Sequence, residues 1–185
     1  MSVHRTAGEG RYAQVEREQR WLLRELPDGL TEPASIVDRY LGGTRLRLRS
    51  VTAGGAATYK LGQKVRPDPD SPAIVKLTNI YLSAQEYQVV YALPGRDLRK
   101  TRWRSPYAAG RLVVDEFTGP LTGLVVAELE LRPDEVPIEL ELPASDVSED
   151  DRFSGGRLAG LSAVDASSLL ADAATLLRSS SGQRE

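Results

Sequence analysis

Charged side chains recur at every second position along several segments of this sequence. The segment from Arg45 to Arg49 alternates arginine with leucine, and residues 100–104 and 128–130 repeat the alternation with other charges. Alternate residues of a β-strand point to the same face, so each segment would present a row of charges. The full set comprises ten basic residues, Arg20, Arg45, Arg47, Arg49, Lys60, Lys64, Lys76, Lys100, Arg102 and Arg104, and five acidic ones, Glu16, Glu18, Asp115, Glu128 and Glu130.

Two arrangements explain such rows. For any single strand the charged face is normally the solvated face, and this interpretation is favoured. Like charges collected on seven predicted strands repel one another unless opposite charge lies among them. If the sheet closes into a barrel, the rows can line its interior, where arginine and lysine would bind phosphate groups. The carboxylates would then require a divalent cation, Mg²⁺ or Mn²⁺, which carboxylate and phosphate oxygens bind together.

Short strand-like segments separated by turn residues are expected to carry these charges. The predicted strands span residues 12–23, 44–51, 57–65, 73–81, 97–104, 111–117 and 124–131. Helices are predicted at residues 31–41, 83–93, 133–142 and 165–178. The first helix would begin at an N-cap Thr31, and the second at a capping box formed by Ser83 and Glu86. The last carries a leucine-rich stripe that should pack on the outside of the sheet.

The composition indicates one globular domain and narrows the chemistry. The 185 residues are 41% apolar and 27% charged, with a net charge of -2, which disfavours a binder of duplex nucleic acid. There is no cysteine, and the single His4 argues against histidine-based zinc catalysis and Ser-His-Asp triads.

The ends of the chain bear on domain limits and location. Residues 1–10 are predicted to form a flexible lead, residues 11–178 the single domain, and residues 179–185 a disordered tail. No segment is apolar enough to cross a membrane, and the N-terminus lacks the apolar part of a signal peptide. A cytoplasmic protein is therefore expected.

The ordered set of motifs resembles the CYTH domains, also called triphosphate tunnel metalloenzymes. Their first-strand signature Glu-x-Glu-x-Lys is matched by Glu16-Arg-Glu18-Gln-Arg20. Residues 45–49, 59–64 and 100–102 resemble the phosphate-binding strands, residues 113–119 and 123–131 the closing strands, and residues 149–159 the C-terminal segment. The resemblance covers roughly residues 11 to 160. It implies an α+β, mainly β fold, an eight-stranded antiparallel closed β tunnel with helices packed outside.

The resemblance also implies roles for individual residues. The metal would be bound by Glu16, Glu18, Asp115, Glu128 and Glu130, among which Glu18, Asp115 and Glu130 are candidates for the catalytic base. The phosphates would be bound by Arg47, Arg49, Lys64, Lys100 and Arg102, to which the alternation of charges adds Arg45, Lys60 and Lys76. Arg20 stands at the signature lysine position and joins this set.

Two departures from the family pattern are present. Arg20 keeps the positive charge of the signature lysine, but a guanidinium cannot give up a proton, which bears on acid–base chemistry there. Many members carry Arg-x-Glu-x-Glu on the fourth strand, whereas residues 76–80 read Lys-Leu-Thr-Asn-Ile and lack both carboxylates. In the family this strand helps to distinguish substrates.

The predicted function is metal-dependent hydrolysis of the terminal phosphate of inorganic tripolyphosphate or a related small triphosphate. Two alternatives remain open at this point. One is other triphosphate chemistry, as in thiamine triphosphatases or adenylate cyclases, and the other is a non-catalytic sensor of polyphosphate or nucleotides. The expected partner is the small-molecule triphosphate, with no membrane contact, and the protein is expected to be a monomer or homodimer.

Overall fold

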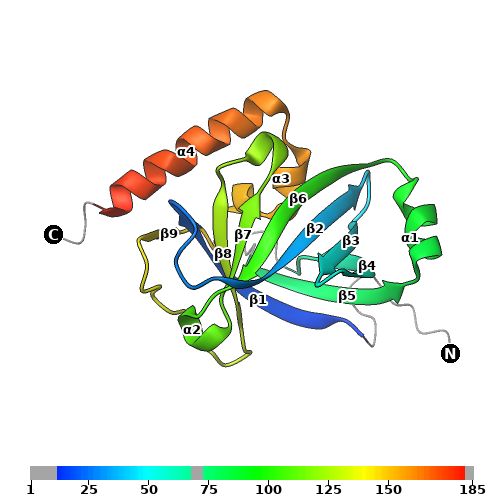
Figure 1. Ribbon diagram of the computed structural model, residues 1–185, viewed down its shortest axis with the longest axis horizontal. Helices are drawn as coiled ribbons and strands as arrows, with labels where there is room; N and C mark the ends of the chain where they lie inside the picture. Colours follow the sequence, from blue (N-terminus) through cyan, green and yellow to red (C-terminus); the bar gives the residue numbers. More distant parts are fainter. Residues whose placement is uncertain (1–11, 68–72, 182–185) are drawn as a thin grey trace.

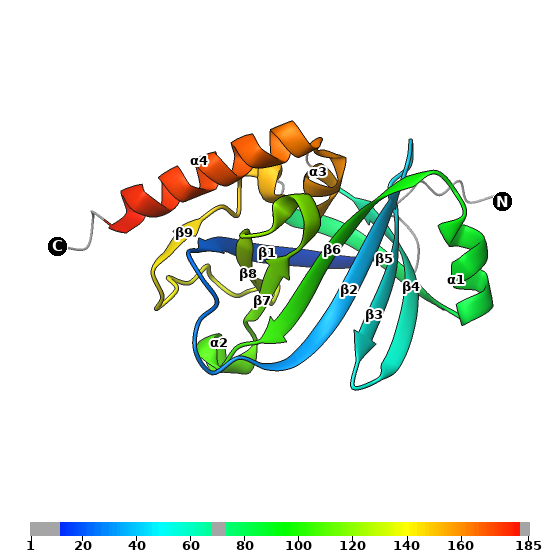
Figure 2. The ribbon, with the colours of Figure 1, turned by 45° about the horizontal axis from the view of Figure 1, so that its top comes forward.

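A single antiparallel sheet closes on itself in this protein. The computed structural model describes residues 12–67 and 73–181. Eight strands form a barrel in the order β1-β5-β4-β3-β2-β6-β7-β8, which closes because β1 pairs with both β5 and β8 (Figures 1 and 2). The strands are β1 (Gln14–Leu23), β2 (Thr31–Leu41), β3 (Leu46–Ala53), β4 (Ala56–Val65), β5 (Ile74–Leu82), β6 (Gly95–Arg104), β7 (Val113–Phe117), β8 (Val125–Leu131) and the additional β9 (Ala144–Asp146). The predicted closed barrel is confirmed.

Strand β1 is the seam of the barrel. One of its edges pairs with β8 over residues 17–23, and the other pairs first with β5 over 14–17 and then with β9 over 21–23. Between these two pairings the backbone N–H of Glu18 donates to Ala73, and that of Arg20 donates to Ser148 Oγ at 3.0 Å. The backbone of this charged stretch is therefore fixed on both sides.

The segment 31–41 is strand β2, and its prediction as a helix is wrong. β2 is paired along both edges, with β3 and with β6. Those two ladders of backbone hydrogen bonds, together with burial of Ile36 and Asp38, outweigh the local helix signals. The Gly42-Gly43 pair is the turn into β3, where Gly43 adopts a φ of +69°.

Two of the predicted helices are confirmed. Helix α1 (Ala84–Tyr91) begins at the expected capping box, in which Ser83 Oγ accepts from the Glu86 N–H at 3.2 Å and Glu86 accepts from the Ser83 N–H at 2.7 Å. Helix α4 (Ala163–Ser181) extends beyond its predicted limits at both ends. The shorter helical segments are α2 (Tyr107–Gly110), η1 (Gly119–Leu121), η2 (Asp151–Phe153) and α3 (Gly155–Gly160).

The helix predicted at residues 133–142 is absent, and this segment is an irregular loop alongside β1. The Gln19 side chain accepts from the Ile138 N–H at 2.8 Å and donates to the Ile138 carbonyl at 3.2 Å. Arg17 donates to the carbonyl of Pro133 at 3.0 Å. Side chains of β1 thus satisfy these backbone groups in place of helical hydrogen bonds.

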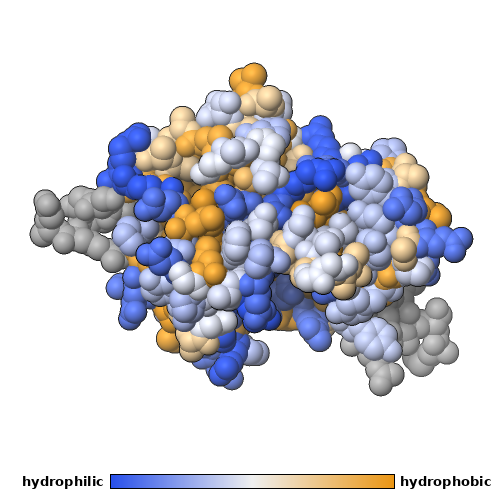
Figure 3. Space-filling model, in the orientation of Figure 1, coloured by the Kyte–Doolittle hydropathy of each residue, from blue (hydrophilic) through white to orange (hydrophobic). Residues whose placement is uncertain are grey.

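Apolar residues gather in two clusters. The first closes one end of the barrel, where Leu98 and Phe117 of the strands meet Phe153 and Leu158 of η2 and α3. α4 lies across this end and contributes part of its apolar stripe, and apolar side chains are visible beneath it in Figure 3. The second cluster covers the outside of β1, β7 and β8, and it includes Trp21, Val114 and Leu129. Because these two clusters occupy one end and the outside of the barrel, the charged rows lie on its inner face.

The ends of the chain are only partly described. The predicted lead at residues 1–10 and the last residues of the predicted tail, 182–185, lie outside the described residues. The first residues of the predicted tail, 179–181, belong to α4. In the described part of the chain, no helix is both long and apolar enough to span a bilayer.

Candidate active site

Strand register brings the charged rows together inside the barrel. Residues directly opposite one another in neighbouring strands lie on the same face of a sheet. Lys64 of β4 contacts Glu16 and Glu18 of β1 although β5 lies between these strands, so this face is the interior. The opposed pairs on this face are Glu18–Glu130, Arg20–Glu128, Arg102–Asp115, Asp38–Arg49 and Arg49–Lys60.

Asp115 is the acidic centre of one wall. Its side chain is 0% exposed, and it accepts from Lys100 Nζ and from Arg102 Nε and Nη2, the latter two at 2.7 Å. Arg102 Nη2 also donates to Glu128. Burial would raise the pKa of Glu128, but Lys100 and Arg102 outweigh it and hold the pKa below its usual range. Asp115 and Glu128 therefore hold two cations in place.

Asp38 is a second acidic centre, which the charge alternation did not indicate because residues 31–41 were predicted to form a helix. Its side chain is 1% exposed, and it accepts from Arg49 Nε at 2.6 Å and from Arg49 Nη2 at 2.7 Å. Arg47 Nε lies 3.6 Å from the same carboxylate. Burial alone would raise the pKa of Asp38, but the two guanidinium groups outweigh it and lower the pKa. A signal was available in the β-branched pair Ile36-Val37, which favours a strand.

Three glutamates form an acidic row at β1 and β8. Glu18 stands directly opposite Glu130, and Glu16 lies two residues before Glu18 on the same face. Lys64 Nζ is 3.7 Å from Glu16 and 3.9 Å from Glu18. Burial, helped by the charges of Glu18 and Glu130, raises the pKa of Glu16, and burial lowers the pKa of Lys64. This row has less compensating positive charge than Asp38 or Asp115.

One nitrogen of each of two buried guanidinium groups in the interior lacks a hydrogen-bond partner among the described residues. Arg20 is 4% exposed and Arg47 is 8% exposed. Within the described residues, Arg20 Nη1 and Arg47 Nε have no hydrogen-bond partner. Leaving a buried donor unpaired costs about 1–3 kcal/mol, more for a charged group. The interior therefore presents unused donors to an anion.

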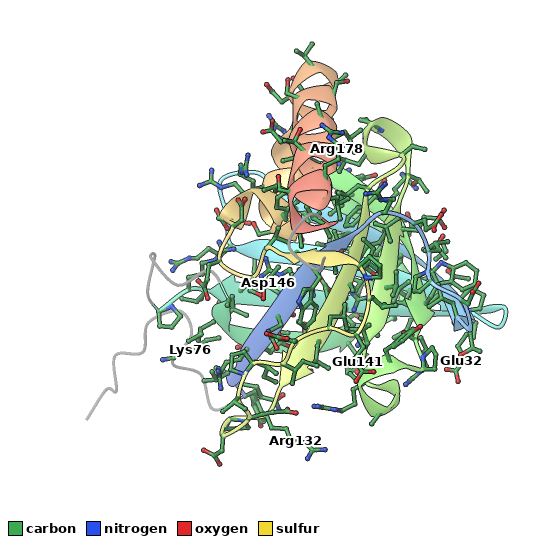
Figure 4. All side chains as sticks on the ribbon, turned by 90° about the vertical axis from the view of Figure 1, so that its left-hand side faces the viewer. Glu32, Lys76, Arg132, Glu141, Asp146 and Arg178 are labelled. Carbon is green, nitrogen blue, oxygen red and sulfur yellow. The ribbon has the colours of Figure 1, made fainter. Side chains whose placement is uncertain are left out.

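Lys76 does not belong to this interior. In the register of β5, Lys76 stands opposite Val15 and Val65, whereas the next residue, Leu77, stands opposite Lys64. Lys76 thus lies on the outer face, at the periphery of the molecule in Figure 4. The prediction that Lys76 binds phosphate inside the barrel is therefore wrong. On β5 the odd-numbered residues face the interior, so the even-numbered Lys76 faces outward.

The residues of β5 that face inward are Val75, Leu77, Asn79 and Tyr81. Asn79 stands opposite Gly62, where a Cβ atom would lie only 2.7 Å from Asn79 Oδ1. Glycine at this position therefore leaves room for the amide. The inner face of the described strand β5 thus carries an amide and no carboxylate.

Arg45 lies at an end of the barrel, and Lys60 lies near the middle of β4. Arg45 is exposed and precedes the first residue of β3. Lys60 opposes Arg49, and its Nζ lies 5.0 Å from the centre of the Tyr81 ring, a cation–π contact. Lys60 is half-buried on the inner face, whereas Arg45 lies outside the buried part of the interior.

The donor types in the interior suit a divalent cation, although the protein alone does not form a complete cage. Among the described residues, no group of three or more carboxylate, histidine or cysteine side chains is arranged to hold a metal ion. Mg²⁺ is commonly bound by one or two carboxylates together with phosphate oxygens of the substrate. The opposed glutamates Glu18 and Glu130, with Glu16 beside them, fit that mode of binding.

Comparison with known proteins identifies the fold. No family model and no curated protein sequence matches this chain. The crystal structure of the hypothetical protein NE1496 is 23% identical, covers 78% of this chain and 97% of its own, and has a TM-score of 0.51. The crystal structure of the inorganic triphosphatase NE1496 is 22% identical, with coverage of 78% and 93% and a TM-score of 0.50.

The barrel with its charged interior defines the triphosphate tunnel fold. The likeness to NE1496 over most of both chains supports this assignment, which the sequence resemblance had implied. Relative to the sequence pattern given above, this chain carries Arg20 at the signature position and no carboxylate on β5.

Proposed function

We propose that this protein hydrolyses the terminal phosphoanhydride bond of inorganic tripolyphosphate, or of a related small triphosphate, inside the charged barrel. The observation that carries the proposal is the pair of buried donors on Arg20 and Arg47 that have no acceptor among the described residues. Phosphate oxygens match the geometry and charge of such guanidinium groups. NE1496, which shares the fold, is described as an inorganic triphosphatase.

The proposed phosphate site combines free and anchored cations. Arg20 and Arg47 supply unpaired N–H groups, and Lys64 is only loosely paired with the glutamates of β1. The remaining cations are held in place by buried carboxylates, so little reorganisation is needed when an anion binds. They are Arg49 on Asp38, and Lys100 and Arg102 on Asp115.

The glutamate row would serve the cation and the attacking water. Glu16, Glu18 and Glu130 would bind Mg²⁺ or Mn²⁺ together with phosphate oxygens, and the bound ion would neutralise charge on the transferred phosphoryl group. Asp115 is withdrawn as a candidate base, because cations engage both of its oxygens and it is fully buried. Glu18 and Glu130 remain as candidates.

In the proposed reaction, water attacks the terminal phosphorus in line with the bridging oxygen. A new P–O bond forms to the water oxygen, and the bond from phosphorus to the bridging oxygen breaks. One water proton passes to Glu18 or Glu130, and the bridging oxygen leaves with the diphosphate. The row of cations would stabilise the charge that the leaving diphosphate acquires.

The test is release of inorganic phosphate from tripolyphosphate, ATP and thiamine triphosphate, each with Mg²⁺, Mn²⁺ or a chelator. We expect metal-dependent release from at least tripolyphosphate. Replacing Glu130 by alanine should abolish it while the protein remains folded by circular dichroism. Unchanged turnover in the Glu130→Ala variant would contradict the proposal.

Lys64 and Lys76 provide a matched pair of variants, because they lie on neighbouring strands but on opposite faces. Lys64→Ala should reduce turnover by about a hundred-fold, the typical effect of removing one transition-state donor. Lys76→Ala should leave turnover near that of the wild type. Equal effects of the two variants would argue against an interior site.

A non-catalytic sensor is the second candidate, favoured by the absence of inward carboxylates on the described part of β5. Tight binding of tripolyphosphate with no phosphate release in any metal would establish it in place of the hydrolase. Location in the cytoplasm, and a monomeric or homodimeric state, remain predictions that fractionation and light scattering can check.

A further inference from the structure

A narrow apolar cavity lies between the C-terminal half of α4 and the end of the barrel that this helix covers. We call this cavity the slot. It has a volume of about 240 Å³ and lies where α4 passes over the last residues of β1 and the first of β8 (Figure 2). None of the residues assigned to the proposed phosphate and metal sites lines it. The slot is therefore separate from the proposed reaction.

The walls of the slot are apolar side chains from α4 and from the barrel. The residues of α4 recur at intervals of three and four, which places them on one stripe of the helix. They are Leu170, Ala173, Ala174 and Leu177. The barrel contributes Leu22, Leu23, Leu124 and Val125. Cavities with such walls stay dry and bind small apolar molecules.

The size of the slot limits the apolar group that it can hold. A cavity of about 150 Å³ with apolar walls binds a benzene molecule. Scaled by volume, the slot would hold roughly eight to ten carbon atoms. It is thus suited to a short chain and too small for a long acyl chain.

The charged groups at the slot are both positive. In the part of the chain that the structure describes, its lining contains two arginines, Arg24 directly after β1 and Arg178 in the last turn of α4, and no carboxylate. Both residues are exposed, and Figure 4 shows Arg178 on α4. Arg178 Nη2 donates to the Thr175 hydroxyl at 2.9 Å, a neutral partner that does not compensate the charge. A guanidinium group pairs readily with a carboxylate, so the edge of the slot suits an anionic head group.

We propose that the slot binds the anion of a medium-chain carboxylic acid, with the chain beneath α4 and the carboxylate at Arg24 and Arg178. Charge complementarity decides between the possible amphiphiles. A cationic head group would be repelled by both arginines, and a neutral one would gain no charge-assisted hydrogen bond. Because α4 also packs on the first apolar cluster, the bound acid would bridge this helix and the closed end of the barrel.

Calorimetry with the full chain and a series of unbranched carboxylates, from hexanoate to tetradecanoate, tests the size of the slot. Affinity should rise about four-fold for each added methylene group while the chain is buried. The rise should stop at roughly ten carbon atoms, where the slot is full. A continued rise to tetradecanoate would indicate general adsorption to apolar surface, and absence of binding along the whole series would equally overturn the inference.

The head group is tested with octanoate and octylammonium, which have the same chain and opposite charges. Octanoate should bind at least about ten-fold more tightly, as expected for hydrogen bonds to charged groups. Arg178→Gln should remove much of this difference, whereas Arg132→Gln, in a loop that does not line the slot, should keep it. Equal affinities of the two ligands for the wild type, or equal effects of the two variants, would contradict recognition of the anion.

Two variants of α4 locate the chain. Ala174→Leu extends a side chain into the slot and should abolish octanoate binding, and leucine is well tolerated in a helix. Ala171→Leu is the matched control, because Ala171 is exposed on the same helix and does not line the slot. Octanoate should raise the melting temperature of the control and not that of Ala174→Leu. The same rise in both variants would overturn the assignment of the slot.

A second copy of the chain is the competing occupant of the slot. Light scattering over a range of protein concentrations should show no association that Ala174→Leu abolishes. A dimer that this variant dissociates, and that octanoate does not disrupt, would assign the slot to a protein interface and overturn the inference.

Discussion

Arg102 donates two parallel hydrogen bonds to Asp115, from Nε to Oδ1 and from Nη2 to Oδ2, both at 2.7 Å. Lys100 donates to the same carboxylate, which has no exposed surface. Both oxygens are thus engaged by cations. In this arrangement Asp115 positions the side chains that would meet phosphate, in place of the metal and base roles predicted from the sequence resemblance.

Replacing Asp115 by asparagine should destabilise the fold, because two cations lose their shared counter-charge. Breaking a buried ion pair typically lowers the free energy of unfolding by about 3–5 kcal/mol. Urea denaturation measures this loss. Glu116→Gln, one residue along on the opposite face of β7, is the control and should change stability by less than about 0.5 kcal/mol. If Asp115→Asn unfolded with the same urea midpoint as the wild type, the positioning role of Asp115 would be contradicted.

Stability should fall in acid because of Asp38. Arg49 and Arg47 overcome the effect of burial and lower the pKa of Asp38 in the folded protein below its value of about 3.9 in the unfolded chain. The unfolded state therefore takes up a proton first as the pH decreases. Stability contributed by the charged carboxylate is complete above about pH 5 and is lost progressively below it.

Measured unfolding free energies at pH 7 and pH 3 test the contribution of Asp38. Asp38→Asn should be less stable than the wild type at pH 7, and its stability should depend less on pH across this interval. Asp134→Asn, at an exposed turn position, should keep the wild-type pH dependence. If the unfolding free energy of the Asp38→Asn protein changed with pH as much as that of the wild type, the pH dependence would come from other groups, and the prediction would be wrong.

Gly155 and Tyr40 should be energetically coupled. A Cβ on Gly155, at the start of α3, would overlap the Tyr40 hydroxyl, while the nearest remaining ring carbon would lie at 3.3 Å. Gly155→Ala should therefore cost about 1–3 kcal/mol of stability by overpacking. In the double variant with Tyr40→Phe much of that cost should disappear, because the overlapping oxygen is removed. A double-mutant cycle of melting temperatures measures the coupling, and simple additivity would contradict the close approach.

The turn between β6 and β7 should become more stable when alanine is replaced by glycine. Ala108 and Ala109 have φ values of 51° and 54°, a left-handed conformation that costs a residue with a Cβ about 1–2 kcal/mol. Glycine relieves this strain but increases the conformational entropy of the unfolded chain. The net effect of Ala109→Gly should be a gain of about 0.5–1 kcal/mol in the free energy of unfolding. Ala84→Gly, in the right-handed helix α1, should lower it. Thermal unfolding of both variants decides the matter, and a less stable Ala109→Gly protein would be the contrary result.

Much of the fold and the candidate site followed from local sequence patterns. The period-two alternation at residues 45–49, 100–104 and 128–130 placed arginines, lysines and glutamates on common strand faces, because successive side chains of any strand point to opposite sides. The spacing of Ser83 and Glu86 marked the start of α1, since both halves of a capping box lie within one turn. These features depend on residues close together in the chain.

Long-range pairing decided the rest. Residues 31–41 have helix signals in isolation and become a strand because β3 and β6 supply hydrogen bonds on both edges, which turns Asp38 into the barrel. The pairing of β5 with β1 and β4 set the phase that turns Lys76 outward. The sequence alone shows that successive side chains of a strand point to opposite faces of the sheet. Only the pairing with neighbouring strands determines which of the two faces is turned to the interior of the barrel. The unpaired donors of Arg20 and Arg47 likewise became apparent only when every neighbour in the closed barrel was in place.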